Sequence, residues 1–253
     1  LFPYTTLFRS SAGLPDLALM ALASLGIAMV SGAAAAFNHV LDQKIDARMA
    51  RTRMRPLPAG RLSNVQAVSF AFALAGAGFA LLLVAVNALT AWLTLAGLFG
   101  YAVVYTVFLK RATPQNIVIG GVAGALPPVL GWTAMTGSVG AEALLLMMII
   151  FTWTPPHFWA LAIHRVEDYR RAGLPMLPVT HGIAFTRTLV LLYTVLLLAV
   201  CLLPYLVGMS GLFYLVGSLV LNLQFLRHAW RLKFAPRADT AIRTFRFSIT
   251  HLM

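Results

Sequence analysis

Three oxygen-bearing side chains recur at a four-residue spacing near the start of the chain. Asn38, Asp42 and Asp46 lie within the segment NHVLDQKID. Positions i, i+4 and i+8 share one face of a helix and span about 12 Å along its axis. Hard oxygen ligands suit Mg²⁺, which proteins usually hold through one or two carboxylates together with substrate phosphates. The spacing therefore indicates a magnesium site. The alternative is that both carboxylates pair with Lys44, Arg48 and Arg51 at a solvated helix end.

Cations cluster beside these acids. The segment RTRMRPLPAGR follows at 51–61, a second basic segment holds Lys110 and Arg111, and a third holds Glu167 and Asp168 followed by further arginines. A metal-bridged diphosphate needs divalent cations as well as Arg or Lys on its remaining oxygens. Two acidic clusters and several cations predict a polyphosphate site beside a lipidic cavity, and an isoprenoid diphosphate is a substrate of that shape.

The composition indicates that membrane-spanning helices must position these residues. The 253 residues are 60% hydrophobic and 10% charged, with a mean hydropathy of +0.84. Soluble domains are roughly 45–50% apolar and about 25% charged, so a soluble or disordered chain is excluded. The net charge of +12 fits membrane lipid or anionic substrates better than nucleic acid, since so apolar a chain offers no groove-reading surface. One cysteine excludes a disulfide framework and Cys-based metal sites.

Seven stretches are long and apolar enough to cross a bilayer, which takes about 20 residues. They are 16–40, 64–86, 88–109, 116–137, 141–163, 185–207 and 210–227. Connections without Lys or Arg alternate with basic ones, which hold 18 of the 19 basic residues. The positive-inside rule places the basic connections in the cytoplasm. We therefore expect an all-α polytopic membrane protein with its acids and cations on the cytoplasmic side.

Several strings resemble UbiA-type intramembrane prenyltransferases, and more narrowly the branch that farnesylates haem. NHVLDQKIDARMARTRMRPLPAGRLS resembles the first signature of the superfamily. The narrower likeness is carried by YTVFLKRATPQNIVIGGVAGALPPVLGW (Tyr105–Trp132), TWTPPHFWALAIHRVEDYRRAGLPMLPV (Thr152–Val179) and FRFSI (Phe245–Ile249). The superfamily often has a second D-x-x-x-D, but here Ala172 follows Asp168 at that spacing. This departure leaves a second metal site with fewer carboxylates and argues against a quinone-pathway enzyme.

The resemblance implies a nine-helix bundle that transfers a farnesyl group from farnesyl diphosphate to a vinyl group of haem b, giving haem O. Mg²⁺ would be the cofactor, haem b a substrate, and the bacterial cytoplasmic (inner) membrane the location. Haem A synthase or terminal oxidase assembly factors are expected partners. The expected metal ligands are Asn38, Asp42, Asp46 and Asp168, and the three aspartates are also the expected catalytic residues. The expected diphosphate-binding cations are Arg51, Arg55, Lys110 and Arg111.

His157 is the histidine that fits a haem contact, because imidazole ligates iron. It lies deep in a predicted span, directly after Pro155 and Pro156. The alternative is a buried histidine hydrogen-bonded to a carbonyl that the two prolines leave free.

Both ends of the chain depart from the expected pattern. Residues 1–10, LFPYTTLFRS, resemble the translation of a sequencing adapter, so the single prenyltransferase domain is expected to occupy 11–253. Residues 241–253 resemble the entry of a further span. We therefore expect a fragment truncated at both ends, whose seven spans are helices two to eight of the nine. The rival functions are a quinone-pathway prenyltransferase and a polytopic transporter.

Overall fold

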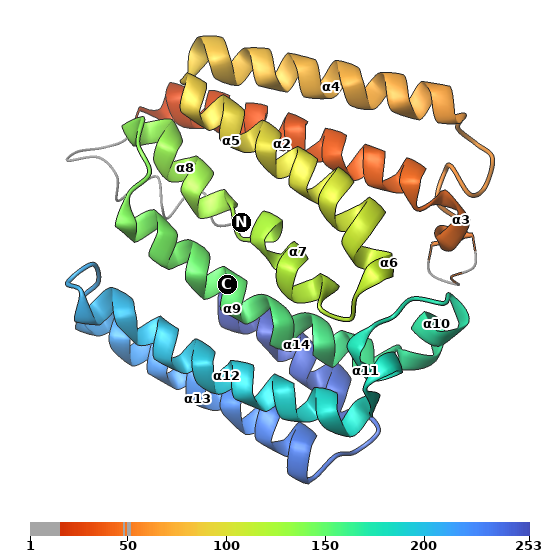
Figure 1. Ribbon diagram of the computed structural model, residues 1–253. Coiled ribbons are helices and arrows are strands. Elements are labelled where there is room, and N and C mark those ends of the chain that lie inside the picture. The colour runs from red at the N-terminus through yellow and green to blue at the C-terminus, as the bar shows by residue number, and fades with distance from the viewer. Residues whose placement is uncertain (1–15, 48, 50–51) are drawn as a thin grey trace. The chain divides into compact units, whose positions relative to one another are not determined.

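The computed structural model describes residues 16–47, 49 and 52–253, and within these residues every regular element is helical (Figure 1). The predicted all-α class is therefore confirmed. The elements are α2 (Leu17–Leu41), α3 (Gln43–Asp46), α4 (Asn64–Ala85), α5 (Ala88–Phe99), the π-helix η1 (Gly100–Leu109), α6 (Lys110–Ala112), α7 (Asn116–Gly124), α8 (Pro127–Thr136), α9 (Ala141–His164), α10 (Val166–Arg171), α11 (Leu177–Thr180), α12 (Gly182–Leu206), α13 (Leu212–Phe234) and α14 (Thr240–Leu252). Residues 1–10 lie outside the described residues.

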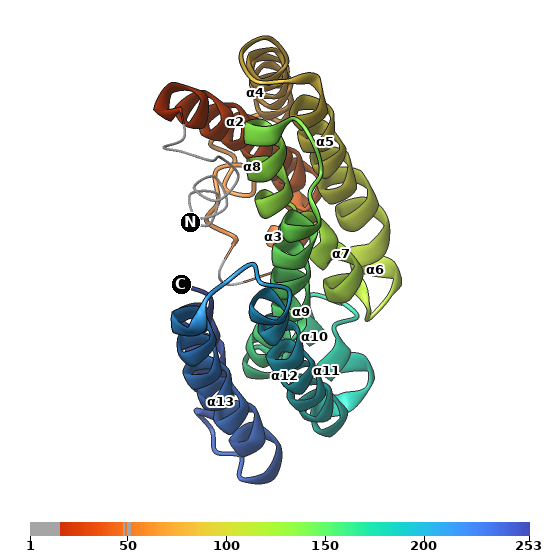
Figure 2. The ribbon, with the colours of Figure 1, turned by 90° about the vertical axis from the view of Figure 1, so that its left-hand side faces the viewer.

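The chain divides into two compact units, of which the first holds residues 1–111 and 126–144. In this unit α2 and α4 lie side by side over most of their length (Figures 1 and 2). Glycines allow the close approach: a Cβ on Gly26 would lie 2.6 Å from Leu82 Cγ, and one on Gly78 would lie 2.8 Å from Met29 Cβ. Small residues at such crossings let helix backbones pack tightly inside membranes. The α2–α4 pair thus fixes where the C-terminal end of α2 lies.

Polar caps close the helix ends of this first unit. Asp16 accepts hydrogen bonds from the backbone N–H groups of Ala18 and Leu19 at the start of α2. Ser63 and Gln66 form a capping box at the start of α4. Both arrangements satisfy amides that have no partner within the helix. At the start of α5, Asn87 caps Thr90.

The second unit holds residues 112–125 and 145–253. Here α12 and α13 lie side by side, and α14 packs against α13 (Figures 1 and 2). Leu197, Cys201 and Phe225 form the buried centre of this packing, with Phe247 of α14 against it. Helix α9 continues through Pro155 and Pro156, and it contributes Ile149 and Trp153 to the same core.

Six of the seven predicted spans correspond to helices that are long and apolar enough to cross a membrane. The 88–109 span is α5 continued by η1, and the 116–137 span is α7 and α8, interrupted before Pro127. The seventh, α13, is a 23-residue helix outside that set, and it runs past the predicted end to Phe234. Its polar Asn222 and its basic last turns lower its hydropathy, while long Lys and Arg side chains let a helix continue beyond the apolar region.

Glycine spacing in α4 provides a test of the α2–α4 packing. We expect Gly78→Ala to lower the free energy of unfolding by about 1–3 kcal/mol, because the added methyl group overpacks the interface. Gly76→Ala is the matched control two residues away, since a Cβ there meets no atom within 4 Å. Thermal unfolding of both variants in detergent measures the difference. Equal stabilities would contradict the close helix approach.

Candidate functional site

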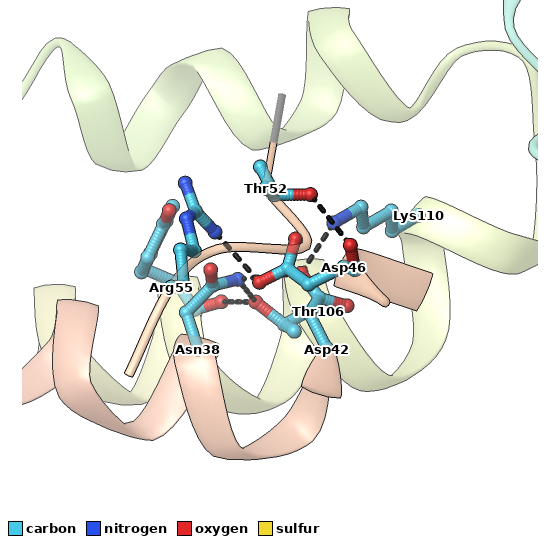
Figure 3. Close-up of polar contacts among 8 residues, drawn as sticks. Asn38, Asp42, Asp46, Thr52, Arg55, Thr106 and Lys110 are labelled. Carbon is cyan, nitrogen blue, oxygen red and sulfur yellow. Dashed lines mark hydrogen bonds and ion pairs between the residues drawn. The ribbon is translucent and has the colours of Figure 1, made fainter. Parts of the chain in front are cut away.

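The three oxygen-bearing side chains of the first motif lie at the C-terminal end of α2. The helix ends at Leu41, and Asp42 adopts a turn conformation (φ −92°, ψ 1°), so the predicted continuous helix is interrupted there. The hydrogen-bond pattern nevertheless continues, because the Asp42 N–H donates to Asn38 O and the Asp46 N–H donates to Asp42 O. Asn38, Asp42 and Asp46 therefore remain grouped at one end of the helix (Figure 3).

A second helical segment supplies a partner for each of the first two residues. Asn38 Nδ2 donates to Thr106 Oγ1 over 2.9 Å, and Lys110 Nζ forms an ion pair with Asp42 Oδ2. Thr106 and Lys110 are four residues apart, as Asn38 and Asp42 are. The two contacts therefore follow one another along the interface between α2 and the η1–α6 segment. The segment that directly precedes Lys110 and contains Thr106 is π-helical.

The hydrogen bond to Thr106 fixes the orientation of the Asn38 amide. The Thr106 hydroxyl donates its single proton to Tyr101 O over 2.8 Å, so it can only accept from Asn38. Asn38 Nδ2 also donates to Asp42 Oδ2 over 3.2 Å. The amide nitrogen is thus committed to two acceptors, and Oδ1 is the atom left to bind a cation.

The loop after α3 brings a second cation to the acids. Arg55 Nη1 pairs with Asp46 Oδ2 over 2.7 Å, and Thr52 Oγ1 donates to Asp46 O (Figure 3). The loop is held in place by the buried Leu57, whose carbonyl accepts from Gln43 Nε2. In Figure 3 the Arg55 guanidinium and the Lys110 ammonium approach the carboxylates from opposite sides.

Burial makes these carboxylates strong cation ligands. The side chains of Asp42 and Asp46 are only 2% and 7% exposed. Asp42 Oδ1 is enclosed and has no hydrogen-bond partner among the residues that the structure describes. A buried carboxylate oxygen without a partner is costly, and a cation would relieve that cost. Among the described residues the carboxylates pair with Lys110 and Arg55 and not with Lys44. Arg48 and Arg51, the other cations of the alternative expectation, lie outside the described residues.

The donor set fits magnesium. Among the described residues no three His, Cys, Asp or Glu side chains come together in a way that could hold a metal by themselves. Two carboxylates and one amide oxygen suit Mg²⁺, which completes its octahedron with water and substrate phosphate. Such a set is poor for Zn²⁺, which prefers nitrogen and sulfur ligands.

Asp168, Arg51 and Arg111 are the remaining residues predicted for this site. Asp168 belongs to the second unit, where it lies in α10, faces Arg165 at 3.6 Å and is more than a third exposed. The neighbouring Glu167 pairs with Arg170. Arg51 and the side chain of Arg111 lie outside the described residues, so their roles stay predictions.

His157 lies in the second unit and is buried. Its Nδ1 is 2.6 Å from Ser248 Oγ of α14, so its partner is a side chain and not a carbonyl freed by the prolines. The sequence reading did not single out Ser248 or Thr106. Ser248 lies within the FRFSI string, which marked the region but not the residue. Thr106 carried no signal, because a threonine in an apolar span is usually a packing residue.

Comparisons with known proteins agree with this fold. The pattern of the family described as "UbiA prenyltransferase family" matches residues 1–250. The chain is 64% identical over 231 residues to "Protoheme IX farnesyltransferase" of Colwellia psychrerythraea, covering 91% of this chain and 76% of the relative. It is 62% identical over 229 residues to "Protoheme IX farnesyltransferase 1" of Vibrio parahaemolyticus, covering 90% and 76%.

Solved structures share the fold at low sequence identity. A digeranylgeranylglyceryl phosphate synthase superposes with a TM-score of 0.82 at 19% identity, covering 99% of this chain and 87% of that one. A UbiA homologue from Archaeoglobus fulgidus, described as bound to DMAPP and Mg²⁺, superposes with a TM-score of 0.66 at 16% identity, covering 99% and 93%.

The Asp42–Lys110 pair predicts a particular pattern of stability without Mg²⁺. We expect Lys110→Met to lower the free energy of unfolding by about 3 kcal/mol, because it leaves a buried carboxylate without its counter-ion. Adding Asp42→Asn should restore most of the loss, since the remaining side chain is neutral. Arg243→Met is the control, because its pair with Asp239 is exposed and contributes at most about 1 kcal/mol. Thermal unfolding in detergent with a chelator measures all four proteins. A double variant no more stable than Lys110→Met would contradict the pairing.

Proposed function

Because the chain belongs to the UbiA prenyltransferase family, we propose that it transfers the farnesyl group of farnesyl diphosphate to a vinyl group of haem b, giving haem O. The observation that carries this proposal is the identity of 62–64%, over about nine tenths of the chain, to relatives named protoheme IX farnesyltransferase. The buried Asn38–Asp42–Asp46 group supports it as a diphosphate site. The enzyme is a multi-pass membrane protein, and we place its site on the cytoplasmic side of the bacterial inner membrane.

Asn38, Asp42 and Asp46 would hold Mg²⁺ in this site. When bound, the ion neutralises charge that develops on the diphosphate leaving group. Asn38 is oriented for this task by Thr106, and one oxygen of Asp42 has no hydrogen-bond partner within the described part of the chain. Asp168 remains a predicted further ligand.

Arg55 and Lys110 would change partners as the substrate binds. In the structure each pairs with a carboxylate. With Mg²⁺ held by Asp42 and Asp46, Arg55 and Lys110 would be able to donate to phosphate oxygens, to which charge-assisted hydrogen bonds are strong. Arg51 and Arg111 are predicted to add to this clamp. The site is thereby close to electrically balanced both before and after the substrate arrives.

The protein must also direct the reaction at C1 of the farnesyl group, the allylic carbon, and protect it from water. The bond between C1 of the farnesyl group and the diphosphate oxygen breaks, and the haem vinyl group forms a new bond to C1. Water then adds to the resulting cation and releases a proton, which gives the hydroxyethylfarnesyl side chain. Apolar helices would bind the farnesyl chain, at about 0.8 kcal/mol per buried CH₂, and limit the access of stray water to the allylic cation. Haem A synthase or terminal oxidase assembly factors are the predicted receivers of the product.

The identity of the molecule that accepts the prenyl group distinguishes this function from the alternative functions. Membranes containing the protein, supplied with Mg²⁺, haem b and farnesyl diphosphate, should yield a farnesylated haem that mass spectrometry identifies. An aromatic acid or quinone precursor offered in place of haem should give no product. Prenylation of those acceptors alone would assign the enzyme to a quinone pathway.

Removal of the metal site should abolish the reaction without preventing membrane insertion. We expect Asp42→Asn to lower kcat/KM at least about 100-fold, because it removes the charge that holds the metal. A chelator should abolish turnover of the unchanged protein, and added Mg²⁺ should restore it. Glu142→Gln is the control, since this acid lies in the first turn of α9, outside the site. Normal turnover of Asp42→Asn would remove the metal-site argument.

A further inference from the structure

A buried imidazole in the second unit is a candidate ligand site that the diphosphate chemistry does not use. His157 lies in α9 directly after the two prolines and is 9% exposed. It faces α14, where Ser248 is fully buried. Both residues belong to the same compact unit.

The hydrogen bonds determine which nitrogen of His157 carries the proton. Ser248 Oγ lies 2.6 Å from Phe245 O and 2.6 Å from His157 Nδ1. The Phe245 carbonyl can only accept, so it takes the single proton of the hydroxyl, and Ser248 Oγ must accept from His157 Nδ1–H. A neutral imidazole has one N–H group, and Nε2 therefore keeps its lone pair.

Nε2 is also left without a partner. It makes no hydrogen bond within the described part of the chain, and His157 keeps a small exposed fraction. A ligand that enters beside the ring would meet this lone pair. The hydrogen bond on Nδ1 is the arrangement that orients a metal-ligating histidine and raises the basicity of its other nitrogen.

Aromatic side chains hold the ring in place. Trp153 stacks on it with a centroid distance of 4.1 Å, Phe245 lies at 4.6 Å, and Phe158 meets it edge-on at 4.9 Å. Trp153 is itself fixed, because its Nε1 donates to Ser248 O over 2.8 Å. The imidazole is thus oriented before any ligand binds.

This environment favours a metal ligand over an acid–base catalyst. A histidine that takes up a proton is normally stabilised by a carboxylate, but none of the ion pairs among the described residues includes His157. Its neighbours are a neutral hydroxyl group and aromatic rings. Neutral imidazole is an axial ligand of haem iron.

We propose that His157 Nε2 ligates the iron of the haem acceptor, and that Ser248 is the positioning residue that presents it. This inference rests on the proposed function, because that function makes haem b the substrate. The porphyrin would thereby be held by its metal, while the vinyl group that reacts stays at its edge.

Haem binding measured by spectroscopy tests the proposal without relying on turnover. Haem b is titrated into the purified protein in detergent, and the Soret band and magnetic circular dichroism report histidine ligation. We expect His157→Ala to lose that signature and to weaken haem binding at least tenfold. Ser248→Ala should weaken binding about 10- to 100-fold, as the loss of an outer hydrogen bond to a ligating histidine does.

Two further variants keep the result interpretable. His157→Gly should recover the ligation spectrum when free imidazole is added, which only a correctly folded cavity allows. His228→Ala is the matched control, because that imidazole stacks on Phe247 in the same unit. An unchanged spectrum in His157→Ala would overturn the inference. If the unchanged protein farnesylates haem while His157→Ala keeps the ligation signature, only this inference fails; if the unchanged protein farnesylates another acceptor and binds no haem, the proposed function fails with it.

Discussion

The first unit is organised by the need to neutralise Asp42 within an apolar helix bundle. A buried carboxylate costs several kcal/mol unless a cation and hydrogen bonds compensate for its lost hydration. Asp42 obtains Lys110 as its ion-pair partner and the Asn38 amide as a hydrogen-bond donor. Each compensating group must in turn be held: Asn38 by Thr106, and Lys110 by the end of the π-helix that precedes it. The close packing of α2 against α4 fixes the position of the C-terminal end of α2, where these polar residues lie.

Each unit stabilises a buried polar side chain, but the two units do so by different interactions. In the first, charge is balanced by charge, and the balance can shift when an anion and a divalent ion arrive. In the second, His157 is neutral and is fixed by the Ser248 hydroxyl and by aromatic rings. Farnesyl diphosphate and haem differ in the same way, since one is a compact polyanion at the end of an apolar chain and the other is a broad aromatic plane with a metal centre. The two polar groups match the two substrates that we propose.

Much of this arrangement could be predicted from the sequence, because helical periodicity and hydropathy are local properties. The spacing of Asn38, Asp42 and Asp46 predicted one grouped set, and all seven predicted spans fall on helical segments, six of them long and apolar enough to cross a membrane. The break at Asp42 was not predicted, since a turn that keeps the i+4 hydrogen bonds leaves no mark in the residue pattern. The partners Lys110 and Ser248 could not be predicted either. They lie 68 and 91 residues from their contacts, and pairing at such distances depends on how the helices pack.

The π-helix has a consequence for how this protein can change. A π-turn is equivalent to one extra residue inserted into an α-helix, and such turns are frequent at functional sites. Thr106 lies within η1 and Lys110 directly follows it, and they meet Asn38 and Asp42 at the same offset in the sequence. Deleting one residue from η1 would leave the segment as apolar as before, so it would still enter the membrane. A deletion before Thr106, however, would rotate both Thr106 and Lys110 by about 100° around the helix axis. The gene segment that encodes η1 should therefore accept many apolar substitutions but no change in length.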